Sequence, residues 1–187
     1  LDNPYGLYWD HESNIIYVSD HWNFRVMRYL LNGTGSGTLV AGGNGAGGNR
    51  NQLNYGVGVF VNKLTNSLFI ANSYTHSILR FSIGINNWTS VVGNNNGLPG
   101  SSSSEFKNPS DVMFDPMDNI YVADRYNNRI QFFLPSQLNG TTIAGVTNVP
   151  GSNSTLLNGP TSIRLDNQLN LYVVDQNNHR VQKFLRY

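Results

Sequence analysis

One motif recurs through the whole chain at a nearly constant interval. A run of apolar residues closes on Asp or Asn four times, as IIYVSD, SLFIAN, NIYVAD and NLYVVD. The closing residues are Asp20, Asn72, Asp124 and Asp175, and successive ones lie 51 or 52 residues apart. A fixed period of this length is typical of solenoids and propellers, in which each unit buries its apolar faces only against its neighbours.

Each repeat contains four short segments with the character of strands. The first follows Pro or Gly (NPYGLYWD, NYGVGVFVN, NPSDVMFD, GPTSIRLD), and the second is the run just described. The third begins at Arg25, Ser77, Arg129 or Arg180, and the fourth reads TLVAGG, TSVVG or TTIAG. These segments are rich in β-branched and aromatic residues and are bounded by turn residues. No stretch repeats its apolar residues with a helical period. We therefore predict an all-β fold, a β-propeller of four-stranded antiparallel blades.

The repeat boundaries divide the chain into about four blades. We expect blade 1 at 1–52, blade 2 at 53–105, blade 3 at 106–156 and blade 4 at 157–187, the last without its fourth strand. An exposed blade edge is an aggregation hazard, so we expect an incomplete arc of a larger ring rather than a closed ring of four. Open edges of this kind could also allow self-association.

Two of the repeats resemble a known family. The third unit reads YVADRYNNRIQFF and the fourth YVVDQNNHRVQKF, with Asn178, His179 and Arg180 in sequence. This pattern resembles NHL repeats, and the resemblance extends over the whole chain, with the second unit the most divergent. It implies a propeller, typically of six blades, which supports the incomplete arc. A peptide-amidating lyase that resembles NHL propellers uses histidines around a central metal, and intracellular NHL proteins are known for binding RNA.

A carboxylate and a guanidinium recur together, five residues apart. The pairs are Asp20 with Arg25, Asp124 with Arg129, and Asp175 with Arg180. The second unit replaces both partners at once, by Asn72 and Ser77. Because an unpaired buried charge is costly, joint loss indicates that the two side chains touch. We interpret each pair as a structural brace of the loop between the second and third strands, and a ring of ligand-binding charges is the less favoured alternative.

Aromatic residues stand two positions after the anchor residue in three of the four units. The series is Trp22, Tyr74, Tyr126 and Asn177. Loops between second and third strands share one face of a propeller with the loops between blades. We therefore expect these residues to form a ligand-binding arc, with help from the loops Gly43–Asn54 and Gly93–Asn108. The alternative is that each ring packs on the neighbouring blade.

Composition excludes several classes of function. With 12 Lys and Arg against 11 Asp and Glu, the net charge of +1 makes nucleic acid an unlikely partner. No apolar run approaches the roughly 20 residues that cross a bilayer. The chain has no Cys, which excludes thiolate chemistry. The Gly-rich stretches between blades lack the Lys of a phosphate-binding loop, so we predict no cofactor.

The histidines do not form a matched set that indicates a metal site. They are His11, His21, His76 and His179, and His11 falls in a link that we expect on the opposite face. A catalytic metal needs several ligands that converge, so we predict no metal and no catalytic residue. The positions expected along the first strands are also apolar, at Leu7, Val59, Val112 and Ile163.

Four sequons bear on where the protein works. Asn32, Asn87, Asn139 and Asn153 each begin an Asn-x-Ser/Thr triplet, and the first three fall between third and fourth strands, at the expected rim. We regard all four as potential glycosylation sites and expect an extracellular or secreted protein, although a cytoplasmic one remains an alternative.

The sequence therefore favours a non-enzymatic module that binds another protein or a glycan. The first alternative is an enzyme of the lyase or hydrolase type, working at the centre of a complete propeller. The second is RNA binding through one face, for which only Arg50, Lys107 and Arg125 lie in suitable loops.

Overall fold

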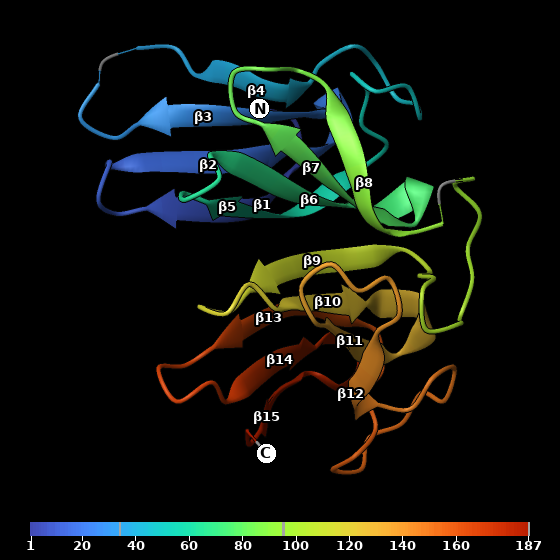
Figure 1. Cartoon of the computed structure of the whole chain (residues 1–187). Coiled ribbons are helices and arrows are strands. Elements are labelled where there is room, and N and C mark those ends of the chain that lie inside the picture. The colour runs from blue at the N-terminus through green and yellow to red at the C-terminus, as the bar shows by residue number, and fades with distance from the viewer. Residues whose placement is uncertain (34, 95, 187) are drawn as a thin grey trace.

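Short antiparallel strands build four blades in residues 1–33, 35–94 and 96–186, which a computed structural model describes (Figure 1). Blade 1 holds β1 (Pro4–Asp10), β2 (Ile15–Asp20), β3 (Arg25–Leu30) and β4 (Thr38–Gly42). Blade 2 holds β5 (Gly56–Asn62), β6 (Ser67–Asn72), β7 (Ser77–Ser82) and β8 (Trp88–Gly93). Blade 3 holds β9 (Pro109–Phe114), β10 (Ile120–Asp124), β11 (Arg129–Phe133) and β12 (Thr141–Gly145). Blade 4 holds β13 (Pro160–Leu165), β14 (Leu171–Asp175) and β15 (Arg180–Phe184).

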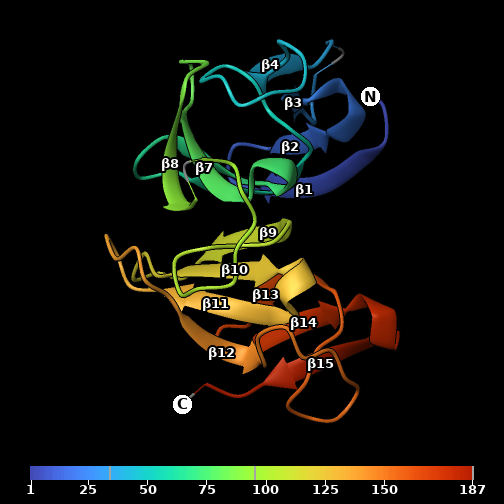
Figure 2. The same ribbon diagram turned by 90° about the vertical axis from the view of Figure 1, so that its right-hand side faces the viewer.

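The blades are arranged side by side as in a propeller. Within each sheet the strands follow one another in sequence order, so the first strand of every blade lies at one edge. These first strands are innermost, because β1 packs on β5, β5 on β9 and β9 on β13. The helices in the described residues are 3-10 turns of three residues each. The predicted all-β propeller of antiparallel blades is confirmed (Figures 1 and 2).

Three apolar clusters fill the spaces between adjacent blades. The cluster between blades 1 and 2 includes Val26, Leu53 and Phe81, all inaccessible to solvent. Similar clusters lie between blades 2 and 3 and between blades 3 and 4. The far flank of blade 4 has no such cover: Val181 is 65% exposed. Its counterparts one, two and three blades earlier are all at 0%, and they are Ile130, Ile78 and Val26. The four blades thus form an arc with an uncovered apolar flank.

One buried side chain per blade ties the second strand to the start of the inner strand. Asp124 Oδ1 accepts a hydrogen bond of 2.8 Å from the Lys107 N–H. The carbonyl of Lys107 in turn accepts from the Tyr126 N–H at 3.1 Å. The same pair of bonds recurs in the other blades. The anchor Oδ1 accepts from the N–H of Asp2 in blade 1, Asn54 in blade 2 and Asn158 in blade 4, and the carbonyl of each of these residues accepts from the N–H of the turn. Two chain segments that meet at one end of each blade are therefore held together.

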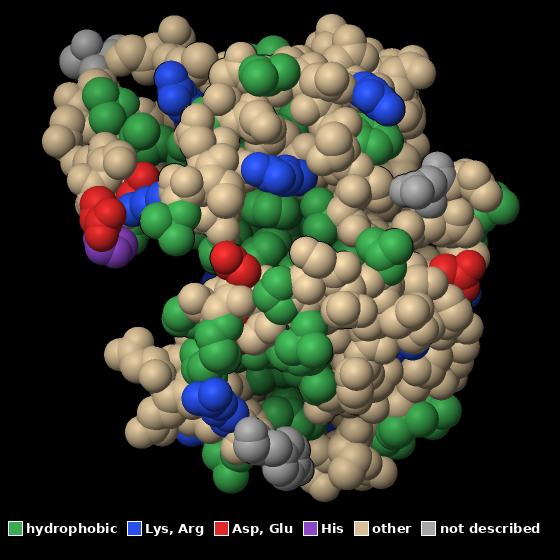
Figure 3. Space-filling view, in the orientation of Figure 1, with side chains coloured by type: hydrophobic (Ala, Val, Ile, Leu, Met, Phe, Trp, Pro, Cys, Tyr) green, Lys and Arg blue, Asp and Glu red, His purple; other side chains and the backbone are tan. Residues whose placement is uncertain are grey.

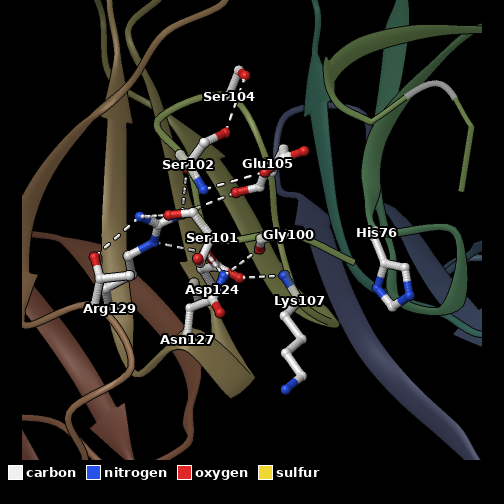
Figure 4. Close-up of polar contacts among 12 residues, drawn as sticks. His76, Gly100, Ser101, Ser102, Ser104, Glu105, Lys107, Asp124, Asn127 and Arg129 are labelled. Carbon is white, nitrogen blue, oxygen red and sulfur yellow. Dashed lines mark hydrogen bonds and ion pairs between the residues drawn. The ribbon is translucent and has the colours of Figure 1, made fainter. Parts of the chain in front are cut away.

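The paired arginine extends this brace to the loop between blades (Figure 4). Arg129 Nε donates to Asp124 Oδ2 at 2.8 Å, while both Nη atoms donate to backbone carbonyls of residues 101–105. Asn127 Nδ2 donates to the same carboxylate oxygen at 2.8 Å. Arg180 repeats the arrangement in blade 4, and Arg25 makes the carboxylate contact at 2.7 Å in blade 1. The contact between these side chains is thus present wherever both partners occur.

Blade 2 builds the brace without charge. Asn72 accepts the Asn54 N–H through Oδ1 and donates through Nδ2 to Thr75 Oγ1 at 2.7 Å. Thr75 Oγ1 lies 2.9 Å from Ser77 Oγ. A neutral amide therefore takes the place of the carboxylate where the guanidinium is missing, so no buried charge is left without a partner.

The environment shifts the pKa values of Asp124 and Asp20 in opposite directions. Burial raises the pKa of Asp124 to about 6, against the lowering effect of the Lys107 N–H, Asn127 and Arg129. At Asp20 burial also acts to raise the pKa, but hydrogen bonds from Asp2, Arg25 and Asn23 outweigh it and hold the pKa below its ordinary value. Arg25 is far more accessible than Arg129, with 35% against 3% of its side chain exposed.

We predict that Arg129→Ser lowers the free energy of unfolding by about 3–5 kcal/mol, because it strands a buried carboxylate and three loop carbonyls. The matched variant Arg25→Ser removes an accessible partner and should cost about 1 kcal/mol or less. Urea unfolding followed by intrinsic fluorescence measures both. Adding Asp124→Asn to Arg129→Ser copies blade 2 and should recover part of the loss. Equal losses for the two single variants would contradict this account.

The carboxyl groups of Asp124 and Asp20 should also titrate in different pH ranges. The folded pKa of Asp124 lies above the unfolded value of about 3.9, so its contribution to stability is present below pH 4 and lost as pH rises through 6. Asp20 has a depressed folded pKa, so its contribution is lost as pH falls below about 4. Carboxyl-carbon NMR between pH 2 and 8 reports both groups. A carboxyl signal of Asp124 that stays constant above pH 5 would refute the assignment.

Candidate binding face

A short 3-10 turn follows the second strand of every blade and opens onto one face of the arc. The turns are η1 (His21–Asn23), η2 (Ser73–Thr75), η3 (Arg125–Asn127) and η4 (Gln176–Asn178). Each ends at a residue in the left-handed region, with φ between 51° and 57°, at Phe24, His76, Asn128 and His179. Figure 2 looks onto this face, where the turns lie beside the loops that connect successive blades.

The turns display the predicted aromatic series to solvent. Trp22, Tyr74 and Tyr126 are 57%, 58% and 50% exposed. Their backbone N–H groups are fixed, since each donates to a carbonyl just before the inner strand of its own blade. Asn177 occupies the same position in blade 4, and its Nδ2 donates to Asn158 Oδ1 at 3.2 Å. The structure therefore places all four residues at equivalent sites, on rigid backbone with accessible side chains.

Other aromatic residues extend the series across the first two blades. Tyr55 lies between Tyr74 and His21, with ring centroids 4.6 Å and 4.9 Å away. Tyr5 lies 5.7 Å from His21 on the other side. The blade 3 ring is paired differently, because the Arg125 guanidinium sits 5.3 Å from the centre of Tyr126. Blades 1 and 2 thus present a row of four rings, Tyr5, His21, Tyr55 and Tyr74, and only Tyr74 belongs to the aromatic series predicted from the sequence.

The histidines have separate structural settings. His11 lies in the link between β1 and β2. The ring of His21 packs beside Tyr55, and its Nδ1 lies 3.1 Å from the Gly56 carbonyl oxygen. His76 and His179 occupy equivalent positions at the ends of their turns, which the sequence analysis did not recognise. His76 Nδ1 accepts from the Asn108 N–H at 3.1 Å, tying blade 2 to blade 3. Burial and the nearby charge of Lys107 lower the pKa of His76 (Figure 4). Within the described ranges no cluster of potential metal ligands forms.

A cavity with polar lining residues lies at the centre of the arc, apart from the aromatic face. The inner strands of all four blades line a cavity of about 380 Å³. Figure 3 shows the molecule hollowed between the half built from blades 1 and 2 and the half built from blades 3 and 4. Leu7 and Val59 line the cavity, whereas Val112 and Ile163 are buried in the clusters between blades. Beside these apolar positions, the polar side chains of Asp111, Ser162 and Arg164 also line the cavity, and the sequence analysis did not single them out.

Asp111 is the most highly bonded of these polar groups. Its Oδ2 accepts from Ser162 Oγ at 2.9 Å, the Ile163 N–H at 3.0 Å and Arg164 Nη1 at 2.9 Å. Burial raises the pKa of Asp111, while Arg164 and the hydrogen bonds act against the rise. The carboxylate therefore clamps blade 3 to blade 4, while 59% of the Arg164 side chain remains accessible.

The sequons lie at the surface. Asn32, Asn87, Asn139 and Asn153 are all exposed, although Thr34 of the first triplet lies outside the described residues. Asn139 Oδ1 accepts from Ser103 Oγ at 3.1 Å. Asn153 Oδ1 caps its own loop by accepting from Thr155 and Leu156. In the described part of the chain no helix has the length and apolar character to cross a bilayer.

Comparison of whole folds finds similar propellers in solved structures. A protein of unknown function from Bacteroides thetaiotaomicron is 15% identical, with a TM-score of 0.79 over 97% of this chain and 47% of its own. An auxiliary nutrient binding protein from the same organism is 20% identical, with a TM-score of 0.71 over 95% and 46%. Virginiamycin B lyase from Staphylococcus aureus is 14% identical, with a TM-score of 0.61 over 98% and 52%. The chain thus spans about half the length of these proteins, which share its fold.

Comparison of sequences identifies the repeat. No curated protein sequence matches the chain. The NHL repeat family matches at two positions, residues 106–133 and 157–184. Each match begins just before an inner strand and ends with the third strand of the same blade, so it contains the anchor carboxylate, the turn and the paired arginine. Blades 3 and 4 therefore each contain an NHL repeat, which confirms the resemblance predicted from the sequence.

Proposed function

We propose that this propeller binds a protein or glycan ligand through the face that carries the 3-10 turns. The observation that supports the proposal is the repeated exposure of Trp22, Tyr74 and Tyr126 on backbone fixed by hydrogen bonds. Exposed rings on rigid backbone give a large contact area at low entropic cost. The fold is shared with auxiliary nutrient binding proteins, which fits a binding role.

We expect the double variant Trp22→Ala, Tyr126→Ala to weaken ligand binding at least tenfold with little change in melting temperature, because both side chains project into solvent. A glycan array and a displayed peptide library would supply ligands. Leu64→Ala is the control, since Leu64 is 95% exposed in the hairpin between β5 and β6, on the opposite face. Equal losses for the control, or no ligand from either source, would refute the proposal.

The second candidate is an enzyme that acts in the central cavity. It is supported by the buried Asp111 and the accessible Arg164, and by the presence of lyases among proteins of this fold. Turnover of a panel of lactones, lost in Arg164→Gln, would favour it over the binding role. The fold should tolerate Arg164→Gln because most of the Arg164 side chain is accessible.

We further propose that the protein is extracellular and glycosylated. Expression in a secretory eukaryotic host should place glycan at Asn139 or Asn32 first, because both lie on exposed turns between third and fourth strands. Intact mass before and after endoglycosidase treatment measures occupancy, and Asn139→Gln identifies the site. A mass that the enzyme leaves unchanged would favour a cytoplasmic protein.

A further inference from the structure

Blade 2 lacks the arginine that fills a loop in blades 3 and 4. In blade 3, Arg129 Nη1 donates to Ser101 O at 3.0 Å, and Nη2 donates to Ser102 O and Glu105 O at 2.8 Å and 2.9 Å. In blade 4 the same three donations go from Arg180 to the carbonyls of Ser152, Asn153 and Leu156. Ser77 stands at this position in blade 2, and its short side chain reaches no further than Thr75 Oγ1.

The loop of blade 2 is nevertheless folded as the other two are. The Gly47 N–H donates to Leu53 O at 3.1 Å, and Gly100 donates to Phe106 O at 3.0 Å. Within this loop, the Asn49 N–H donates a hydrogen bond of 3.3 Å to Gln52 Oε1. The counterpart in blade 3 joins Ser102 to Glu105 Oε2, also at 3.3 Å. Gly48 and Asn49 therefore occupy the places of the carbonyls that hold the Arg129 guanidinium.

A cavity of about 250 Å³ lies between Ser77, the counterpart of Arg129, and Gly48, the counterpart of Ser101. Its lining includes Gly48 from the loop, Thr75 and Ser77 from the turn and β7, and Trp88, Ser90 and Asn94 from the outer edge of the blade. None of the described residues that line it carries a charge. Trp88 Nε1 donates to Asn49 O at 2.9 Å, which fixes the indole as one wall.

These groups match the chemistry of a guanidinium. Carbonyl, hydroxyl and amide oxygens accept hydrogen bonds, and a guanidinium donates five and accepts none. Its planar face also packs on an indole. We propose that the blade 2 cavity receives an arginine side chain of a partner protein. The inference rests on the proposed binding role, because the cavity adjoins the turn that carries Tyr74 and the loops at 43–54 and 93–108.

Titration with N-acetyl-arginine methylamide tests the proposal directly. In proton–nitrogen NMR spectra we expect a saturable shift of the Trp88 indole N–H in the millimolar range, while the indole of Trp9 stays unmoved. The matched probe is the citrulline analogue, which has the same shape without charge and should bind at least tenfold more weakly. Equal affinity for the two probes, or no saturable shift at Trp88, would overturn the proposal.

Two variants should abolish the shift by filling the cavity. Asn72→Asp with Ser77→Arg copies blade 3, so the chain's own guanidinium should occupy the site without lowering the melting temperature. Ser90→Leu fills the cavity from the outer strand and leaves the brace intact. Retained binding in Ser90→Leu would contradict the assignment even if the double variant failed to fold. The pair Trp22→Ala, Tyr126→Ala should leave arginine binding unchanged, which separates failure of this inference from failure of the proposed binding role.

Discussion

A buried anchor side chain with its full set of donors is the constraint on which each blade depends. Removing a carboxylate from water costs several kcal/mol unless charged or polar donors replace the water. Asp124 receives a backbone N–H from Lys107, an amide from Asn127 and a guanidinium from Arg129, and the guanidinium also donates to the loop before the inner strand. Satisfying one side chain therefore fixes an inner strand, a turn and a loop at once.

The same constraint accounts for the binding face. Because the backbone of each turn is bonded to the start of an inner strand, the turn is held without the side chain at its second position, and that side chain remains exposed. Tyr74 and Tyr126 could therefore stay exposed without loss of the fold. Blade 2 differs, because its uncharged anchor Asn72 needs no arginine partner, and a cavity lies beside the binding face of this blade.

Most of the architecture could be predicted from the sequence, because a 51–52-residue period repeats the same strand pattern four times. The pairing of Asp124 with Arg129 was also visible, as joint loss in the second unit. The carbonyl contacts of Arg129 were not, since backbone acceptors leave no mark on residue type. Asp111 and Arg164 were missed for a different reason: each occurs in one blade only, so no repeat pointed to them. The row of rings joins two blades through His21 and Tyr55, which lie 34 residues apart in sequence, so no local pattern indicated their contact.

The arginines and anchor residues hold the loops between blades through main-chain atoms of those loops. Arg129 and Arg180 bind carbonyl oxygens, and the anchor residues bind N–H groups, so these contacts do not depend on the identity of the loop side chains. Among those side chains, Asn153 caps its own loop and Ser103 bonds Asn139. Such a loop can keep its conformation while its sequence changes. Selection, or an engineer, could rewrite these positions to change what the propeller recognises while the grip on the chain stays the same.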